Sequence, residues 1–239
     1  MRVCVLSDVH SNLPALEAVL AAAAPYDALW QLGDVVGYGP QPNEVVARLA
    51  EEHAVGVRGN HDSAALGELA TDTFNDAARE AVEWTAGQLD DAARQWLGKL
   101  PLRDEQPPFT LVHGSPRDPT WEYVFSPAAA RGNLDAFATT HCLVGHTHVP
   151  LVFRDSGRRL ETLVPNGAAL ALDERRTLLN PGSVGQPRDG DPRACGMLID
   201  TEALSVEWLR VEYPFERVQK LMAGAGLPQR LAARLALGL

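Results

Sequence analysis

The segment RVCVLSDVHSNLPALEAVLAAAAP occupies residues 2–25 and combines two hydrophobic patterns. It begins with a short apolar run rich in β-branched residues, which is typical of a buried strand. Helical spacing follows over residues 14–24, where Pro14 is compatible with a first turn and Pro25 marks the end. The apolar positions of this second pattern are Leu16, Val19, Leu20 and Ala23. The segment therefore predicts a buried strand followed directly by a helix.

The same alternation continues along the chain. Strand-like runs recur at ALWQLGD (28–34) and AVGVRGN (54–60), and a helical pattern over residues 42–52 separates them. This β-α-β-α-β order predicts a partly parallel sheet in a layered α/β fold. Two further strand-like runs, FTLVHG (109–114) and HCLVGHTH (141–148), follow later.

Residues 63–108 interrupt this order with a mostly helical pattern. We expect two helices, separated near residues 87–91, that form an insertion or cap within a single domain spanning residues 1–239. Beyond residue 150, short apolar runs separated by turn signals predict further strands. Residues 214–239 predict one or two amphipathic C-terminal helices. Packing on the domain or on a partner subunit is favoured for them over a membrane-surface role.

The composition limits the classes of partner. The formal net charge of −10 argues against binding of extended duplex nucleic acid. The cysteines Cys4, Cys142 and Cys195 lie far apart in apolar settings, which predicts buried thiols in a reducing compartment. The first ten residues are too polar for a signal peptide or a membrane span. We expect a soluble, cytoplasmic protein, either a monomer or a small homo-oligomer.

Residue types that bind metal follow each of the five strand-like runs. In open α/β sheets, binding sites gather at the carboxyl ends of strands, so these residues are expected to converge. Five of the seven histidines fall at such positions, whereas His53 is assigned to a helix end and His141 to a turn. The converging residues are Asp8, His10, Asp34, Asn60, His61, Asp62, His113, His146 and His148.

The mixture of carboxylate, imidazole and amide groups indicates the kind of metal. It is compatible with Mn²⁺, Fe, Ni²⁺, Co²⁺ or Zn²⁺, and the absence of cysteine argues against a closed structural zinc site. The groups are too many for one ion. They fit two ions about 3.5–4 Å apart that share a bridging carboxylate.

The ordered motifs D-x-H, G-D, G-N-H-D, H-G and G-H-T-H resemble those of the calcineurin-like metallophosphoesterases over roughly residues 1–210. The segments GDVVGYGPQPNEVV and NPGSVGQPRD resemble the small bacterial and archaeal branch of that family. The resemblance implies two packed mixed β-sheets flanked by helices, an αββα sandwich, with a small helical insertion. It also implies a dinuclear metal centre, with manganese favoured.

The resemblance further implies a role for each residue. One ion would be held by Asp8, His10, Asp34 and His148. The other would be held by Asp34, Asn60, His113 and His146, so that Asp34 bridges. A metal-bridging hydroxide would attack phosphorus in line, and His61 would assist the leaving oxygen. Asp62 would orient the His61 ring or raise its pKa, cap a helix, or do both.

Four further residues are candidates for contact with substrate, each with a structural alternative. Asn12 could bind phosphate or cap the helix that begins near Pro14, and Tyr38 could line the pocket or stiffen a turn. Arg188 and Arg193 could bind a substrate phosphate or be ordinary surface arginines in a turn. The tryptophans have core or cap explanations and are assigned no chemistry.

Several functions remain open on the sequence alone. A phosphodiesterase is favoured by the resemblance to the small branch. A phosphomonoesterase, including a protein phosphatase, and a dinucleoside polyphosphate hydrolase are alternatives within the same chemistry. A nuclease that acts on short oligonucleotides or cyclic nucleotides is another. A non-catalytic metal-binding scaffold belongs to a different class, and the presence of His61 with every expected ligand argues against it.

Overall fold

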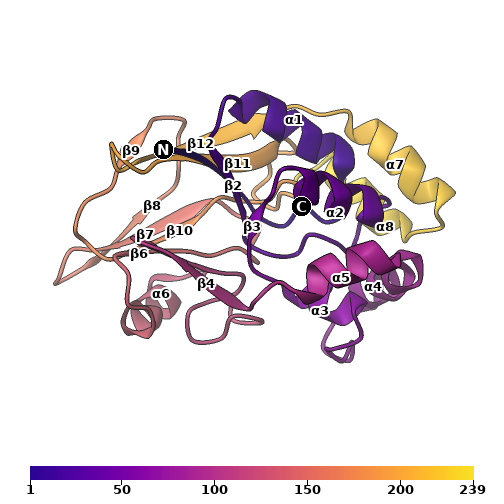
Figure 1. Cartoon of the computed structure of the whole chain (residues 1–239), viewed down its shortest axis with the longest axis horizontal. Coiled ribbons are helices and arrows are strands. Elements are labelled where there is room, and N and C mark those ends of the chain that lie inside the picture. Colours follow the sequence, from indigo (N-terminus) through magenta and orange to yellow (C-terminus); the bar gives the residue numbers. More distant parts are fainter.

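The computed structural model describes residues 1–239 and places its strands in two six-stranded sheets (Figure 1). The first sheet has the order β3-β2-β1-β11-β12-β9. Its first three strands are parallel and joined by helices α1 and α2, which confirms the predicted β-α-β-α-β unit. The strands of this sheet are β1 (Arg2–Leu6), β2 (Ala28–Gln31), β3 (Val55–Gly56), β9 (Leu170–Ala171), β11 (Ala194–Asp200) and β12 (Ser205–Val211). The two helices are α1 (Leu13–Ala23) and α2 (Pro42–Glu51).

The second sheet has the order β4-β5-β6-β10-β7-β8 and is also mixed. β6 pairs in parallel with both β5 and β10, while the two hairpins at the edges are antiparallel. Its strands are β4 (Arg103–Gln106), β5 (Phe109–Val112), β6 (His141–Leu143), β7 (Leu151–Asp155), β8 (Leu160–Leu163) and β10 (Thr177–Asn180).

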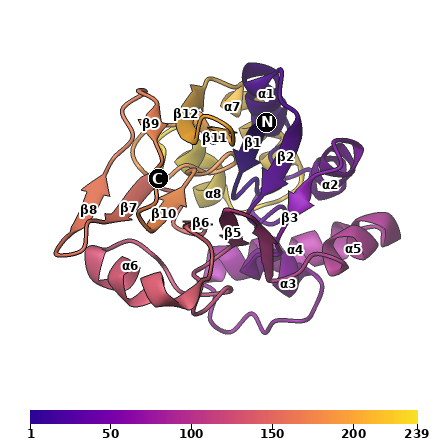
Figure 2. The ribbon, with the colours of Figure 1, turned by 60° about the vertical axis from the view of Figure 1, so that its left-hand side comes forward.

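Alternation along the strands builds the layers. In β1, Val3 and Val5 enter the core shared by the two sheets, whereas Cys4 and Leu6 face the helices. In β6, Leu143 enters the shared core and Cys142 packs toward helix α6 (Pro127–Asn133) and a short 3₁₀ turn, η1 (Leu134–Ala136). This period of two places helices outside both sheets (Figure 2), so the αββα sandwich is confirmed.

Three helices follow β3: the first begins ahead of residues 63–108, the range that the sequence assigns to an insertion with two helices, and the other two lie within it. They are α3 (Asn60–Ala65), α4 (Asp76–Gln88) and α5 (Asp91–Gly98). The break between α4 and α5 falls where the sequence predicts it, because Asp90 caps the N-terminus of α5. The range 63–108 is not helical throughout, since β4 extends the edge of the second sheet.

The C-terminal segment forms helices α7 (Phe215–Gly224) and α8 (Gln229–Leu235). Val218 and Met222 of α7 and Leu231 of α8 are buried in the same core as α1, so these helices pack on the domain (Figure 1). None of the helices is long and apolar enough to span a membrane.

All three cysteines are buried and unpaired, as predicted. The assignment of His141 to a turn is wrong, because this residue is buried and begins β6.

Candidate metal centre

The candidate ligands come from loops at the carboxyl ends of five strands. The loop after β1 carries Asp8 and His10, and the loop after β2 carries Asp34. The other loops follow β3, β5 and β6, and their ligands are Asn60, His113, His146 and His148. All seven of these residues are buried. Because the two sheets pack face to face, the loops at these strand ends gather side chains that lie up to 140 positions apart in the sequence.

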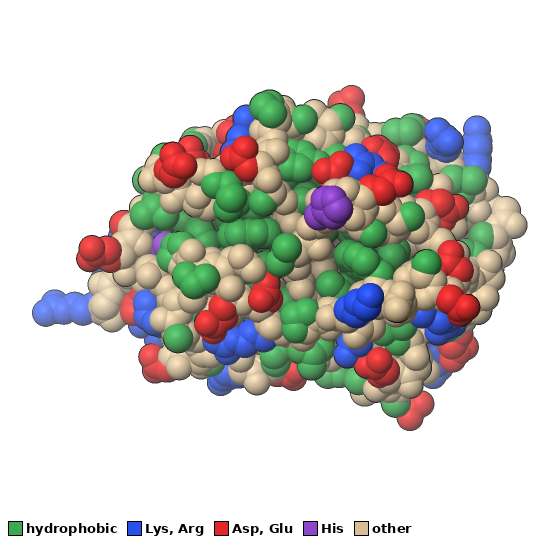
Figure 3. All heavy atoms as spheres, in the orientation of Figure 1, with side chains coloured by type: hydrophobic (Ala, Val, Ile, Leu, Met, Phe, Trp, Pro, Cys, Tyr) green, Lys and Arg blue, Asp and Glu red, His purple; other side chains and the backbone are tan.

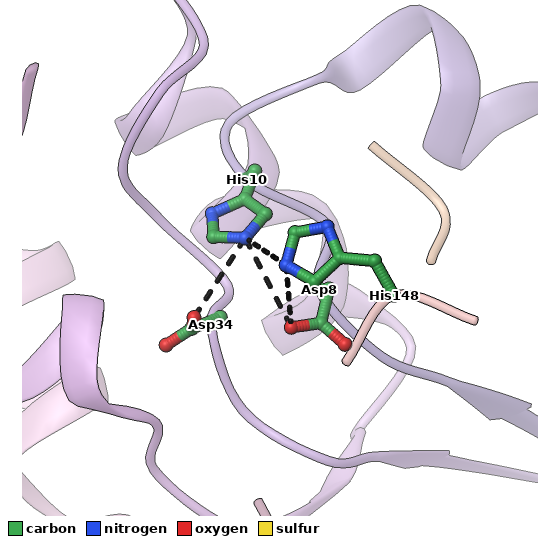
Figure 4. A group of neighbouring side chains, drawn as sticks. All are labelled: Asp8, His10, Asp34 and His148. Carbon is green, nitrogen blue, oxygen red and sulfur yellow. Dashed lines mark hydrogen bonds and ion pairs between the residues drawn. The ribbon is translucent and has the colours of Figure 1, made fainter. Parts of the chain in front are cut away.

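The first ligand cluster consists of Asp8, His10, Asp34 and His148 (Figure 4). The Nε2 atoms of His10 and His148 are 3.2 Å apart. Oδ1 of Asp8 lies 3.2 Å from Nε2 of His148, and Oδ2 of Asp34 lies 3.7 Å from Nε2 of His10. Four potential ligand atoms therefore surround one point.

The second cluster combines Asp34 with His113 and His146. Nε2 of His113 lies 3.3 Å from Oδ2 of Asp34 and 3.1 Å from Nδ1 of His146. Asn60 completes the cluster, because its Oδ1 is 3.0 Å from Nε2 of His113. Oδ2 of Asp34 faces both clusters, which is the placement that a bridging carboxylate requires.

These spacings fit metal ions. Two nitrogen or oxygen atoms that each lie about 2.1 Å from one ion are about 3.0–3.4 Å apart at tetrahedral or octahedral angles. The distances in the second cluster fall in this range, as do those from Nε2 of His148 to His10 and to Asp8 in the first. In addition, Oδ1 of Asp8 is buried without a hydrogen-bond partner. Such an orphaned buried acceptor is costly unless a ligand satisfies it. The residues present therefore fit two divalent ions.

The outer ring nitrogens are held by backbone carbonyls. Nδ1 of His10 donates to Val36 O (3.1 Å), and Nδ1 of His113 donates to Leu32 O (2.9 Å). Nδ1 of His148 donates to the carbonyl of Gln186 at 2.6 Å. Each bond fixes the tautomer that leaves the Nε2 lone pair facing the cluster. His146 is reversed and presents Nδ1 instead.

The backbone at the ligands is unusual. Five of them have positive φ angles between 48° and 64°, namely Asp8, His10, Asp34, His146 and His148. Non-glycine residues rarely adopt this left-handed conformation, which is strained for most side chains. Left-handed backbone turns the chain sharply at the strand ends, so that several side chains from one loop reach the same point.

Burial sets the charge state of the histidines. It lowers the pKa of His146 to about 3 and that of His10 well below its ordinary value, so both rings are neutral near pH 7. Burial also lowers the pKa of His113, but the adjacent Asp34 carboxylate outweighs it and raises the pKa to about 9. A metal ion at this position must displace that proton. Neutral rings beside ionised carboxylates are the forms that bind divalent metals.

His61 lines the pocket beside the ligands but contributes no atom to either cluster. Its backbone N–H donates to Oδ1 of Asp34 at 2.9 Å, which fixes the orientation of the bridging carboxylate. Its ring packs edge-on against His10 and Phe74. Burial lowers the pKa of its ring to about 4. A phosphate anion in the pocket would offset this effect by favouring the protonated ring.

The sequence allows two roles for Asp62, and the structure shows the capping role. Its Oδ2 accepts from the N–H of Gly59 and its Oδ1 from the N–H of Val36, both at 2.9 Å. Both oxygens are thus occupied by backbone, and the expected contact with the His61 ring is absent. Asp62 ties the loop after β2 to the start of α3, and burial raises the pKa of its carboxyl to about 6.

A cavity of about 80 Å³ opens beside the clusters. Of the four weaker candidates, the structure brings two to it, Tyr38 and Arg188. The guanidinium of Arg188 bonds Oε1 of Gln186 (2.9 Å) and the Tyr38 hydroxyl (3.4 Å), and no carboxylate pairs with it. Arg193 is paired with Asp191 on the surface and is not brought to this cavity.

The side chain of Asn12 is engaged at both ends. Its Oδ1 accepts from the N–H of Ala15 at 3.2 Å, which caps α1, and its Nδ2 donates to Gly185 O at 3.0 Å. Of its two expected roles, the helix cap is therefore the one found. Asn12 joins the loop after β1 to the loop before β11.

The sequence did not identify two further parts of the site. The aromatic residues Phe74, Trp121 and Tyr123 line the cavity. Behind the cavity, Val218, Met222 and Leu235 of the C-terminal helices line a small space together with His10 and Tyr38. Apart from His10 and Tyr38, none of these residues lies directly at the end of a strand, where the metal-ligand pattern of the sequence points.

The fold and the paired ligand clusters define a metallophosphoesterase. Residues 1–203 match the calcineurin-like phosphoesterase superfamily domain, and the chain belongs to that family. Membership of this family implies hydrolysis of phosphate esters. The expected ordered motifs therefore identified the family correctly.

Three relatives illustrate the similarity. A metallophosphoesterase from Sphaerobacter thermophilus has a crystal structure with a TM-score of 0.93 and 46% identity, covering 100% of this chain and 99% of the relative. The uncharacterized protein MJ0912 of Methanocaldococcus jannaschii is 35% identical over 99% of this chain and 98% of its own length. Phosphodiesterase YfcE of Escherichia coli is 29% identical over 86% of this chain and 91% of its own length.

Proposed function

We propose that this protein hydrolyses phosphodiesters with two divalent transition-metal ions, and that manganese serves in this role. The observation that carries the proposal is the position of Asp34 Oδ2, which faces both ligand clusters. The relative named as a phosphodiesterase in Escherichia coli supports the choice of ester. When bound, two such ions activate water for attack and neutralise charge that develops on the phosphate oxygens.

The residues of the chain orient the phosphate and handle the proton. Arg188 lies at the cavity without a carboxylate partner, so its guanidinium is free to bind a non-bridging oxygen. Tyr38 holds this guanidinium through its hydroxyl. His61 faces the same cavity and protonates the leaving oxygen once phosphate has raised its pKa.

The charge of the cavity favours a diester over a monoester. Arg188 is the only Lys or Arg residue in its lining. A phosphodiester carries one negative charge, whereas a monoester near pH 7 carries nearly two. One guanidinium together with the ions is sufficient for the first. A phosphomonoesterase or a dinucleoside polyphosphate hydrolase remains the alternative if the monoester or polyphosphate is the better substrate.

The remaining proposals concern partners and location. On the face in Figure 3, Lys and Arg side chains are scattered among acidic ones and form no continuous stripe. This distribution supports a small phosphate ester as substrate in place of an extended duplex. Three buried free thiols support a cytoplasmic location. We propose a monomer or a small homo-oligomer.

His61→Ala tests the proposed mechanism. The variant should retain both metal ions, because no ring atom of His61 belongs to a cluster. Its kcat on an unactivated diester, such as a dinucleoside monophosphate, should fall about a hundred-fold because the leaving alkoxide loses its proton donor. The fall should be smaller for nitrophenyl esters, whose leaving groups need little protonation.

The matched control is His53→Ala, which removes an exposed histidine at the end of α2 and should leave kcat unchanged. Metal content is measured by elemental analysis of the same samples. Full activity of His61→Ala on the unactivated diester would remove this residue from the reaction. Wild-type activity on monoesters alone would favour the phosphomonoesterase.

A further inference from the structure

The loop between β5 and α6 places two aromatic side chains at the cavity, Trp121 and Tyr123. The ring of Tyr123 stacks on the imidazole of His146, with centroids 3.9 Å apart and an angle of 22° between the planes. Tyr123 is nevertheless 52% exposed. Since His146 covers one face of the ring, the exposed area includes the opposite face.

Two further aromatic rings, Phe74 and Trp121, line the same cavity as Tyr123. Trp121 packs edge-on against Phe74, with ring centroids 5.2 Å apart, and Phe74 packs edge-on against His61 at 4.9 Å. Together with His61, these two rings form an aromatic wall on one part of the cavity lining. The only guanidinium of the lining belongs to Arg188, which pairs with no carboxylate. A site that can bind an anionic phosphate thus lies next to an exposed planar ring.

We propose that the substrate is a nucleotide-type phosphodiester whose base stacks on the outer face of Tyr123. This inference rests on the proposed phosphodiesterase function and adds the substrate class. Aromatic side chains next to a phosphate-binding site are a recurrent way to hold nucleobases, because every base offers a planar π-face.

The distances separate a nucleotide from a smaller aryl ester. A base stacked on Tyr123 at a spacing similar to that of His146 would lie about 8 Å from the imidazole centroid. A pentose between phosphate and base spans such a gap. In an aryl ester the ring is attached directly to the ester oxygen. That ring would therefore lie closer to the phosphate than a base that a pentose separates from it.

The reaction itself leaves the base unchanged. The oxygen of water forms a bond to phosphorus, and the bond from phosphorus to one ester oxygen breaks. That oxygen takes up a proton, so the products are a nucleoside monophosphate and an alcohol. The stacked base stays attached to the phosphate, which Arg188 and ions held by the two ligand clusters would bind.

The test compares two ligands that differ only in the base. Binding of AMP and of ribose 5-phosphate to the Mn²⁺-loaded protein is measured by calorimetry. We expect AMP to bind about ten-fold more tightly, as expected for one stacked base. The ratio of the two affinities should fall to about one in Tyr123→Ala and stay near ten in Tyr123→Phe. Because a ratio is used, any effect of the substitution on His146 cancels.

The control is Phe125→Ala, which removes a neighbouring aromatic side chain that is 58% exposed but does not line the cavity. Its affinity ratio should match that of the wild type. Equal affinity of the wild type for the two ligands would overturn the inference. A ratio that Tyr123→Ala leaves unchanged would also overturn it.

A kinetic comparison separates this inference from the proposed function. Thymidine 5′-(4-nitrophenyl phosphate) and ethyl 4-nitrophenyl phosphate share a leaving group, and only the first has a base. Higher kcat/KM for the thymidine ester supports the inference, whereas equal values contradict it and leave the phosphodiesterase intact. If neither ester is hydrolysed with any metal, the proposed function fails, and the affinity ratio still decides whether a base is bound.

Discussion

Replacing Asp34 by Asn should remove one metal ion and lower kcat about a thousand-fold, because both clusters share this carboxylate. Oδ2 of Asp34 lies 3.7 Å from Nε2 of His10 and 3.3 Å from Nε2 of His113. An amide has the same shape but no negative charge, and only one of its two terminal atoms can bind a metal. In the wild type, Oδ1 is already held by the N–H of His61. The substitution therefore affects the ions far more than the fold.

The measurement is metal content per chain together with hydrolysis of bis(4-nitrophenyl) phosphate. Asp173→Asn is the matched control, since it changes an exposed carboxylate that pairs with Arg175 far from the ligand set. The control should keep two ions and full turnover. If Asp34→Asn also bound two ions and turned over normally, Asp34 would not be the bridge.

Gly59→Ala should weaken metal binding about 10–100-fold, although Gly59 touches no ion. A Cβ at this position would overlap Oδ1 of Asp34 and would lie 2.8 Å from its Cγ. The bridging carboxylate or the start of α3 must then move. Either shift also disturbs the bonds that Asp62 makes to Gly59 and Val36. We expect the free energy of unfolding to fall by about 2 kcal/mol in the metal-free protein.

Gly87→Ala is the control for this substitution. Gly87 lies in helix α4, and an added Cβ there meets nothing within 4 Å. Alanine favours a helix over glycine, so this variant should be as stable as the wild type or more stable by about 0.5–1 kcal/mol. Calorimetric Mn²⁺ titration and thermal unfolding measure both effects. Unchanged metal affinity in Gly59→Ala would show that a side chain at residue 59 does not displace the carboxylate of Asp34.

The sequence was informative where structure depends on local pattern. The unit from β1 to β3 could be predicted because the hydrophobic periodicity of a strand or a helix can be recognised within a short stretch of sequence. The ligands could be located because each follows a buried strand, and parallel strand ends share an edge. His146 and His148 illustrate this, since both lie directly beyond β6 and each joins a different cluster.

Other features depend on contacts between distant segments and leave no local signal. The carboxylate of Asp62 bonds Val36, which is 26 positions away, so its partner could not be read from the motif that contains it. Phe74, Trp121 and Tyr123 line one cavity, although they come from two loops that show no periodic sequence pattern. The packing of α8 behind Tyr38 likewise depends on tertiary structure. Propensity and periodicity report on residues that are close in sequence, whereas these contacts join residues that only the folded structure brings together.

The left-handed backbone of the ligands links the fold to the chemistry. Asp8, His10 and Asp34 are held at φ angles of 48° to 53° by backbone bonds between their loops, including the N–H of His10 to Asp34 O at 3.0 Å. Strain of this kind persists only where surrounding structure enforces it. The backbone therefore holds these side chains toward the two clusters.

The most direct test of the account is restoration of activity by metal in chelator-stripped wild-type protein. Mn²⁺, Ni²⁺, Co²⁺, Zn²⁺ and Mg²⁺ are each titrated while hydrolysis of bis(4-nitrophenyl) phosphate and 4-nitrophenyl phosphate is followed in parallel. We expect turnover to rise with the second bound ion, to be greatest for Mn²⁺, and to favour the diester. Turnover without any metal would contradict a dinuclear phosphodiesterase. A complete lack of turnover with two ions bound per chain would also contradict it.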